Sequence, residues 1–324
     1  MEEFFIRISS TTPMNVGGAN PRSSNPPTLP SIKGALRFWY RVILGTRFQG
    51  NLSCVSRRES LLFGSTEHQS PIHLSFQHGR SRRNEFTLHV RIIPELIAKE
   101  LPRMEMSKDD IRQEFAKALW MWSHFGGLGK GTRRGKGSIQ VIADGGLFPS
   151  DWKLQTESPT VTGLVSFYQT VLAKILSTDT KPSSQLGPLP PFTYFCPHSR
   201  LFLQEVENEK VGAKQMLTDQ KLSKSPLYFQ PKEKAFFSLP QKGFGKETLQ
   251  GQARHSSPLL ISIKKFGNKT VLTYLLLPNR IKSLEPPTPS GQESLQQHIL
   301  STYHKFCNRY LLDLKQAKEV KLHV

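Results

Sequence analysis

Apolar and polar positions follow regular patterns in six successive stretches of the first 150 residues. Alternation of apolar and polar residues predicts a strand, and apolar residues recurring about every 3.6 positions predict a helix. The elements predicted in this way are strand 4–8, helix 30–44, strand 72–76, strand 86–92, a helix from Ser107 to Gly126, and strand 139–141. This order is the ferredoxin-like βαββαβ arrangement that RNA-recognition modules share. The aromatic signature of those modules is absent from the last strands, so base stacking on the sheet face is not expected.

The remaining residues predict a second domain of mixed helix and strand. A turn-rich stretch from Gly145 to about Thr160 indicates a junction, so we expect domains at 1–150 and 151–324. The expected elements are a helix at 164–177, strand-like runs at 192–206, 227–239, 258–265 and 270–277, and a closing helix from Glu293. Residues 45–70 give a mixed pattern, and the order of strands in the second domain does not follow from the sequence.

The net charge of the chain indicates an anionic binding partner. Lys and Arg outnumber Asp and Glu by 44 to 25, which gives a net charge of +19 and a pI near 10.0. Such a balance is typical of nucleic-acid binding, and an anionic membrane surface is the competing partner. No apolar run approaches the ~18 residues that span a membrane, and no basic amphipathic helix with an exposed apolar face stands out. The start of the chain does not resemble a signal peptide, so we expect a cytoplasmic protein without a membrane partner.

The most distinctive stretch is the glycine-rich loop, residues 125–138, FGGLGKGTRRGKGS. Its cations are Lys130, Arg133, Arg134 and Lys136. Glycine lets backbone approach a ligand closely and adopt positive φ, so this loop could direct N–H groups and cations at phosphate oxygens. Neither the Walker pattern nor GxGxxG fits it. The alternative is a flexible turn with solvated charges.

A second basic feature lies on the helix expected at 30–44. Lys33, Arg37 and Arg41 recur every fourth residue, so they share one stripe while apolar residues cover another face. We call these three residues the α-stripe. A solvated surface and phosphate contact explain it equally well when it is taken alone. Arginines at 80, 82 and 83 form a hairpin tip, where charges are commonly only solvated.

Catalytic and metal chemistry are weakly represented. His68, His73 and His78 recur every fifth residue, a spacing that would not bring them together on a strand and turn, and HExxH is missing. The cysteines form no CxxC pair, so neither a metal nor another cofactor is expected. His124, beside the glycine-rich loop, and His255 could act as general acid or base on a ribose 2′-hydroxyl, although such histidines more often only form hydrogen bonds.

Several of these motifs together resemble a known family. SIKGALRFWYRVILG after a Pro/Gly-rich loop, LFGS near residue 62, GGLGKGTRRGKGSI and the later RHSSPLLISI are similar to the RAMP superfamily of CRISPR-associated proteins. Within it they resemble the subunit-one family of type III-B (Cmr) RNA-targeting complexes. The helix motif and the loop motif are specific, whereas the patch in the second domain is a weaker match.

The resemblance implies two ferredoxin-like folds, the second decorated, and RNA binding without a nuclease centre. It implies a place near the 3′ end of the guide RNA, capping a filament of related subunits and contacting guide or target RNA. Carried onto this chain, the RNA-binding residues are the α-stripe, the four loop cations, Arg254 and His255. The family often has two arginines at the last two positions, so His255 departs from its pattern.

The residues and the resemblance agree on a non-catalytic RNA-binding subunit of a CRISPR effector complex, whose partners are guide RNA, target RNA and other subunits. We expect the α-stripe and the loop cations to line one groove. Two alternatives stay open: a metal-independent endoribonuclease that processes CRISPR repeats through His124 or His255, and a protein–protein scaffold whose charge meets other subunits.

Overall fold

A computed structural model shows how the chain folds. It describes residues 1–16, 26–77, 84–96, 106–156, 159–177, 189–206, 257–280, 288–314 and 317–322. The arginine tip at 80–83, the strand-like run at 227–239, Arg254 and His255 lie outside the described residues. Within the described part, no helix is long and apolar enough to cross a membrane.

The first half of the chain has the predicted ferredoxin-like order. Its elements are β1 (Glu2–Ser10), α1 (Leu29–Arg47), α2 (Leu52–Phe63), β2 (Ile72–Phe76), β3 (Glu85–Ile92), α4 (Lys108–Phe125) and β4 (Ile139–Ala143). The strands form an antiparallel sheet in the order β2-β3-β1-β4. Among the elements given for the described residues of this half, α2 is the addition to the predicted list, because the sequence of residues 45–70 gave no clear period.

Local sequence explains where these elements begin and end. In β1, Phe4, Ile6 and Ile8 are buried while the residues between them face outward. Helix α4 begins with a capping box in which Ser107 and Asp110 bond to each other's backbone N–H groups, and it ends at Gly126. The predicted strands and helices of this half are therefore confirmed.

The second half repeats the sheet topology. Its elements are η2 (Ser150–Trp152), α5 (Val161–Ile175), β5 (Arg200–Val206), β6 (Leu259–Phe266), β7 (Lys269–Leu276), α9 (Pro289–Lys305), the π-helical segment η4 (Phe306–Leu314) and β8 (Lys318–Val320). The strand order β6-β7-β5-β8 corresponds position by position to that of the first sheet. Two four-stranded antiparallel sheets of this kind confirm the α+β, doubly ferredoxin-like fold class. The connection from β5 to β6, where such a fold has its first helix, lies outside the described residues.

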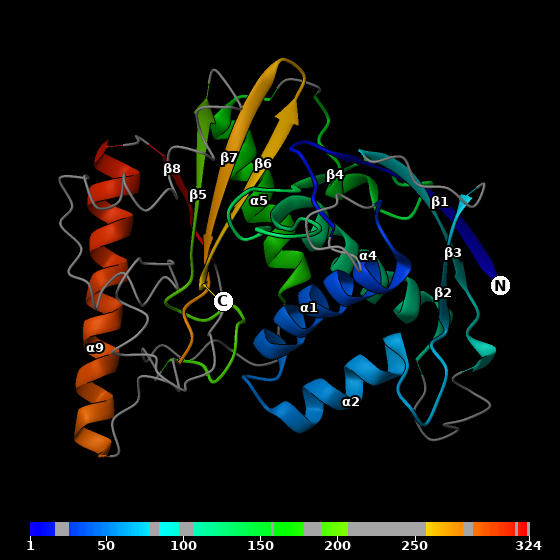
Figure 1. The fold of residues 1–324 in the computed structure, drawn as a ribbon, viewed down its shortest axis with the longest axis horizontal. Helices are drawn as coiled ribbons and strands as arrows, with labels where there is room; N and C mark the ends of the chain where they lie inside the picture. The colour runs from blue at the N-terminus through cyan, green and yellow to red at the C-terminus, as the bar shows by residue number, and fades with distance from the viewer. Residues whose placement is uncertain are drawn as a thin grey trace.

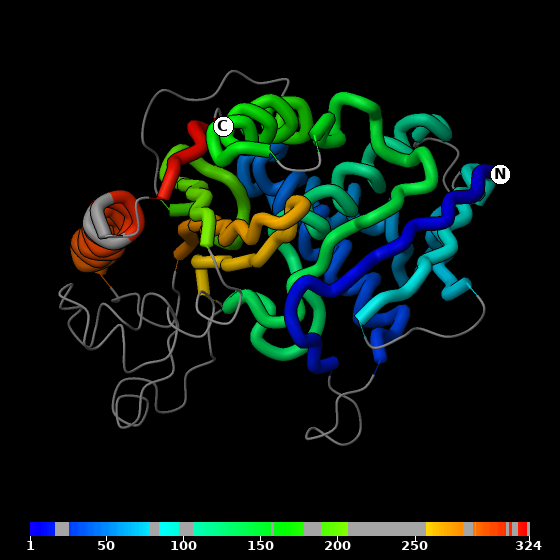
Figure 2. Tube along the Cα trace, turned by 90° about the horizontal axis from the view of Figure 1, so that it is seen from above, coloured from blue at the N-terminus to red at the C-terminus, as the bar shows by residue number. Residues whose placement is uncertain are grey.

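The elements stack in layers, as Figure 1 shows from left to right: α9, the second sheet, the central helices, and strands β1 to β3 of the first sheet. Figure 2 shows the same separation from above, with α9 at one end and the first sheet at the other. Alternate residues of β5 belong to two different apolar clusters. Leu201 and Leu203 pack toward the central helices, whereas Phe202 packs with Ile299 and Tyr303 of α9.

The outer edge of β6 joins the two halves. This strand ends the second sheet, and its outward backbone groups bond to the first half instead of to another strand. The bonds run from Ile261 N–H to Arg133 O (3.0 Å), from Ile263 N–H to Ser138 Oγ (3.1 Å), from Thr11 Oγ1 to Ile263 O (2.5 Å), and twice between Lys265 and the Gln140 amide (2.9 and 3.2 Å). The glycine-rich loop therefore sits at the junction of the halves.

Candidate nucleic-acid interface

The α-stripe lies on α1, whose start is fixed by its sequence. Thr28 caps the helix, its side chain and that of Ser31 form a capping box, and Pro30 occupies the first turn. Successive α-stripe residues are one turn apart and so share one side of the helix. All three side chains retain access to solvent.

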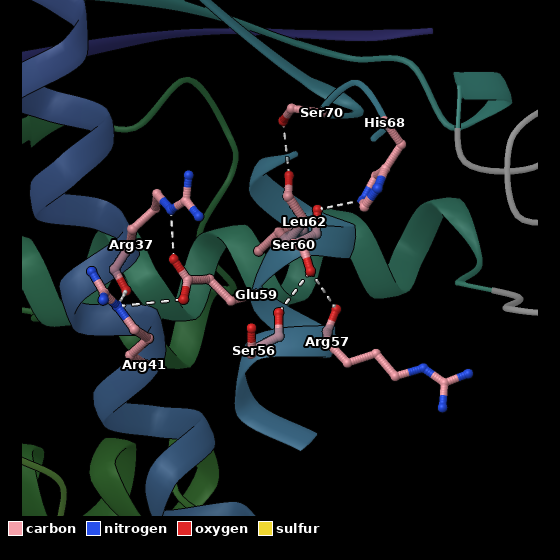
Figure 3. A network of polar contacts seen from close by, with 9 residues as sticks. All are labelled: Arg37, Arg41, Ser56, Arg57, Glu59, Ser60, Leu62, His68 and Ser70. Carbon is pink, nitrogen blue, oxygen red and sulfur yellow. Dashed lines mark hydrogen bonds and ion pairs between the residues drawn. The ribbon is translucent and has the colours of Figure 1, made fainter. Parts of the chain in front are cut away.

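A buried carboxylate on α2 organises the two arginines of the α-stripe. Glu59, 7% exposed, accepts from Arg37 Nε at 2.5 Å and pairs with Arg41 Nε at 3.4 Å. Figure 3 shows this carboxylate between the two guanidinium groups. The Arg37 and Arg41 side chains remain 35% and 49% exposed, so one anion orients two cations without burying them. The group keeps a net positive charge, as a phosphate-binding surface requires.

The loop after α2 is fixed against that helix. Gly64 has φ +79°, and a Cβ there would lie 2.8 Å from Ser70 N, so glycine is required. His68 Nδ1 lies 2.9 Å from Ser65 Oγ, and His68 Nε2 donates to Ser60 O at 2.8 Å. Figure 3 shows the bond from His68 to Ser60 O and the bond that Ser70 donates to Leu62 O. The motif LFGS, one of those that resemble the RAMP superfamily, thus lies at a rigid turn.

This turn and two residues of the α-stripe, Lys33 and Arg37, border an open hollow of about 1010 Å³. Its lining comprises Lys33, Arg37, residues 63–70, Ile72, His73, Leu74 and Arg91. Three of these side chains are basic, Lys33, Arg37 and Arg91, and Glu67 is the one acid among them. Partial burial, followed by the charge of Arg37, lowers the pKa of Lys33. A bound phosphate would offset this repulsion, so the hollow, which we call the α1–α2 hollow, favours an anionic chain.

The glycine-rich loop has a different structure from the one expected. Its amides largely bond to protein: Leu128 to Gly137 O, Lys130 to Asn15 O, and Gly137 to Pro13 O. A Cβ on Gly137 would lie 2.1 Å from Leu128 O, and Gly137 has φ +60°. The close approach that glycine permits is therefore to the chain's own backbone. This corrects the expectation of amides directed at phosphate, so any phosphate contact by the loop would come from side chains.

The loop cations separate into two kinds. Lys130 and Lys136 are exposed, and Arg134 is half-buried. Arg133 is turned inward: its guanidinium donates to Ser257 O across the junction and lies 5.2 Å from the centroid of the Phe38 ring. Burial lowers the pKa of Arg133 to about 10. Arg133 thus holds the two halves together, and RNA contact by the other three loop cations stays a prediction.

Lys33 and Arg37 of the α-stripe line the α1–α2 hollow, whereas Arg41 and the glycine-rich loop do not. Arg37 and Arg41 face Glu59 of α2, whereas Phe38, about 100° further round the helix, faces Arg133. The single groove expected for both segments is corrected accordingly. The physical reason is that the two segments bind different parts of the chain. Glu59 of α2 pairs with the arginines of the α-stripe, whereas Arg133 bonds to residues in and beside β6.

His124, the residue named for the nuclease alternative, belongs to an aromatic cluster. Its ring stacks on Trp120 with centroids 4.0 Å apart, and Nδ1 lies 3.1 Å from the Tyr168 hydroxyl. Burial and then the charge of Lys264 lower the pKa of His124 well below its usual value. The imidazole is therefore neutral at pH 7 and already bonded.

The sequence did not reveal Glu59 or Arg91. In the sequence RRESLLF, Glu59 follows two arginines and resembles an exposed residue. It is buried because α2 packs against α1. Arg91 alternates with Val90 and Ile92 on β3, which places it outward, but nothing in the sequence places it beside Lys33.

Comparison with known proteins supports this description. Residues 7–140 match the RAMP superfamily. The CRISPR system Cmr subunit Cmr1-2 of Pyrococcus furiosus is 25% identical over 180 residues, which cover 44% of this chain and 96% of that protein. The chain also has the fold of solved structures at low identity.

The apo crystal structure of Cmr1 from Pyrococcus furiosus has a TM-score of 0.57 and 17% identity and covers 100% of both chains. A chain of the type III-B Cmr-beta complex bound to cognate target RNA has a TM-score of 0.61 and 13% identity, over 93% of this chain and 100% of that one. The same kind of complex with AMPPnP and in the presence of single-stranded DNA gives 0.63 and 14%, over 94% and 99%.

Proposed function

Because residues 7–140 match the RAMP superfamily, we propose that this chain is a non-catalytic RNA-binding subunit of a type III-B CRISPR effector complex in antiviral defence. In this proposal it caps the assembly near the 3′ end of the guide RNA and contacts guide or target RNA. The observation that carries the proposal is the α1–α2 hollow, where Lys33, Arg37 and Arg91 gather around a rigid turn.

The proposed contact is with the RNA backbone. Lysine and arginine in an open hollow neutralise phosphates of any sequence, which positions the RNA but does not specify it. Pairing between guide and target supplies the sequence choice, as in other RNA-guided systems. The endoribonuclease alternative gains no support from His124, whose ring is neutral, bonded and enclosed by aromatic residues.

The test measures RNA affinity of the full chain as a function of salt, from about 50 to 200 mM. We expect Lys33→Ala and Arg91→Ala each to weaken binding and to reduce the slope of log K against log salt by about one, because each removes one phosphate contact. Lys174→Ala is the matched control: it removes one positive charge from α5, where Lys174 pairs with Asp151.

Equal losses in the three variants would mean that only net charge matters, and the α1–α2 hollow would not be the binding surface. Incubation of the protein with CRISPR repeat RNA in EDTA tests the non-catalytic part of the proposal. Defined cleavage that disappears in His124→Ala would overturn it.

A further inference from the structure

The outer face of the first sheet carries an exposed aromatic residue. The alternation of β1 buries Phe4 and Ile6 against the helices and turns Phe5 outward, where it is 46% exposed. In Figure 1 the labelled helices lie to the left of β1 to β3, and this outer face points to the right. The sequence offered no aromatic residues in the last strands, but this one is on the first strand, in the middle of the sheet.

Phe5 is held in a stack with a residue of the neighbouring strand. It is the register partner of His89 on β3, and the two rings lie parallel, with centroids 4.5 Å apart and planes 8° apart. His89 Nδ1 lies 3.4 Å from Ser75 Oγ, and Nε2 lies 3.4 Å from Glu3 Oε2 without a hydrogen bond. One face of the Phe5 ring is therefore covered by a fixed partner.

A glycine lies next to Phe5 on the side away from β3. A Cβ on Gly145 would lie 2.8 Å from Phe5 O, so this position brings no side chain beside the ring. Since Phe5 is 46% exposed although His89 covers one face of its ring, the other face is open. A flat group entering there would extend the stack of His89 and Phe5 by one member.

Cations flank this stack along the strands. Arg7 lies two residues beyond Phe5 on the same face, and Arg91 lies two residues beyond His89. The pairing of Arg7 with Glu85 is loose, at 4.0 Å with both side chains more than half exposed. Arg7 can therefore turn to a phosphate at little cost, because exposed ion pairs of this kind contribute little to stability.

We propose that the free face of Phe5 is a stacking site for an unpaired base of single-stranded RNA, with Arg7 at the adjoining phosphate. The choice of RNA as ligand rests on the proposed function, whereas the stacking site is centred on Phe5 and shares only Arg91 with the α1–α2 hollow. Aromatic side chains on an open sheet, combined with nearby cations, are the means by which single strands are bound without sequence preference.

The experiment compares Phe5→Ala, Phe5→Leu and Phe5→Trp in the full chain, with fluorescently labelled oligouridine and an RNA duplex of equal length as probes. Loss of one stacked base weakens single-strand binding by about tenfold. We expect this loss in Phe5→Ala and Phe5→Leu and none in Phe5→Trp. The salt slope should not change, and the duplex should bind as before. Ile142→Ala, which removes another exposed apolar side chain, is the control.

Each other outcome is decisive. If Phe5→Leu binds oligouridine like the parent protein, stacking is not the interaction, and an apolar contact with a protein partner becomes the occupant of this face. If all Phe5 variants bind normally while Lys33→Ala lowers the salt slope, the stacking site is refuted and the proposed function stands. If Lys33→Ala has no effect but Phe5→Ala does, the proposed α1–α2 hollow fails and the stacking site is retained. Urea unfolding of each variant verifies that it is folded.

Discussion

The α-stripe and the glycine-rich loop are both rich in cations, yet the structure uses them differently. In the α-stripe, Glu59 orients Arg37 and Arg41 and leaves both partly exposed, and Arg37 lines an open hollow. In the loop, Arg133 is turned into the junction between the two halves, and backbone amides bond to the chain itself. The comparison teaches that density of charge along a sequence does not show which charges remain available to a ligand. The buried carboxylate of Glu59 leaves its two arginines accessible to solvent, whereas Arg133 is engaged in a contact with the chain itself beside β6.

Among the variants that distinguish the two regions, we expect the largest loss of stability from substitution of a glycine in the loop. Gly137→Ala places a Cβ 2.1 Å from Leu128 O at a residue with φ +60°, so both strain and a backbone clash must be relieved. We expect the free energy of unfolding in urea to fall by about 3 kcal/mol or more.

Two alanine variants are controls for Gly137→Ala. Gly146→Ala also has positive φ, +85°, but open space, and should cost about 1 kcal/mol. Gly34→Ala, in α1 with no atom within 4 Å of the added Cβ, should stabilise by a similar amount. A loss in Gly137→Ala no larger than in Gly146→Ala would show that the loop backbone yields easily, contrary to the rigid junction described here.

These glycines also show what sequence can and cannot reveal. Periodicity placed β1 and α1, and Ser107 with Asp110 placed the start of α4, because each signal lies within one element. The composition of the loop identified an unusual backbone. It could not show whether the backbone approaches a ligand or itself, because the answer depends on Asn15 and on β6.

The same limit applies to the candidate site. The spacing of Lys33, Arg37 and Arg41 placed them on one side of a helix, and the structure places Lys33 and Arg37 in the lining of the α1–α2 hollow. The burial of Glu59 depends on the packing of α2 against α1, and the inward position of Arg133 depends on Ser257, 124 residues away. Such contacts between distant segments leave no periodic trace in the sequence.

The second largest effect on stability is expected from a lysine that forms hydrogen bonds at both ends of the glycine-rich loop. Lys264 of β6, buried, donates to Ser123 O at 2.6 Å and Ile139 O at 2.5 Å, and these carbonyls flank the glycine-rich loop. Burial lowers the pKa of Lys264 to about 7 from 10.5. Above pH 7 the unfolded chain holds this proton and the folded chain releases it, so the free energy of unfolding rises with pH.

We expect this rise to approach about 1.4 kcal/mol per pH unit between pH 7.0 and 8.5. Thiols and the α-amino group also titrate near this window, so the relevant quantity is the difference in slope between the parent protein and Lys264→Met. In Lys264→Met the contribution should vanish, whereas Lys265→Met, which changes the exposed neighbour, should retain it. Urea unfolding at several pH values measures the slope. Parallel slopes in the parent protein and Lys264→Met would show that the junction leaves this lysine fully charged.

The smallest effect compares two cations within the loop itself. Arg133→Met removes the bond to Ser257 O and the contact with Phe38, so we expect a loss of about 1–2 kcal/mol in stability. Lys136→Met changes an exposed side chain and should alter stability by less than about 0.5 kcal/mol. RNA binding should respond in the opposite sense: Lys136→Met makes the salt dependence shallower by about one, and Arg133→Met leaves it unchanged. If Arg133→Met instead flattens the salt dependence without loss of stability, its guanidinium reaches RNA and the loop resembles the α-stripe after all.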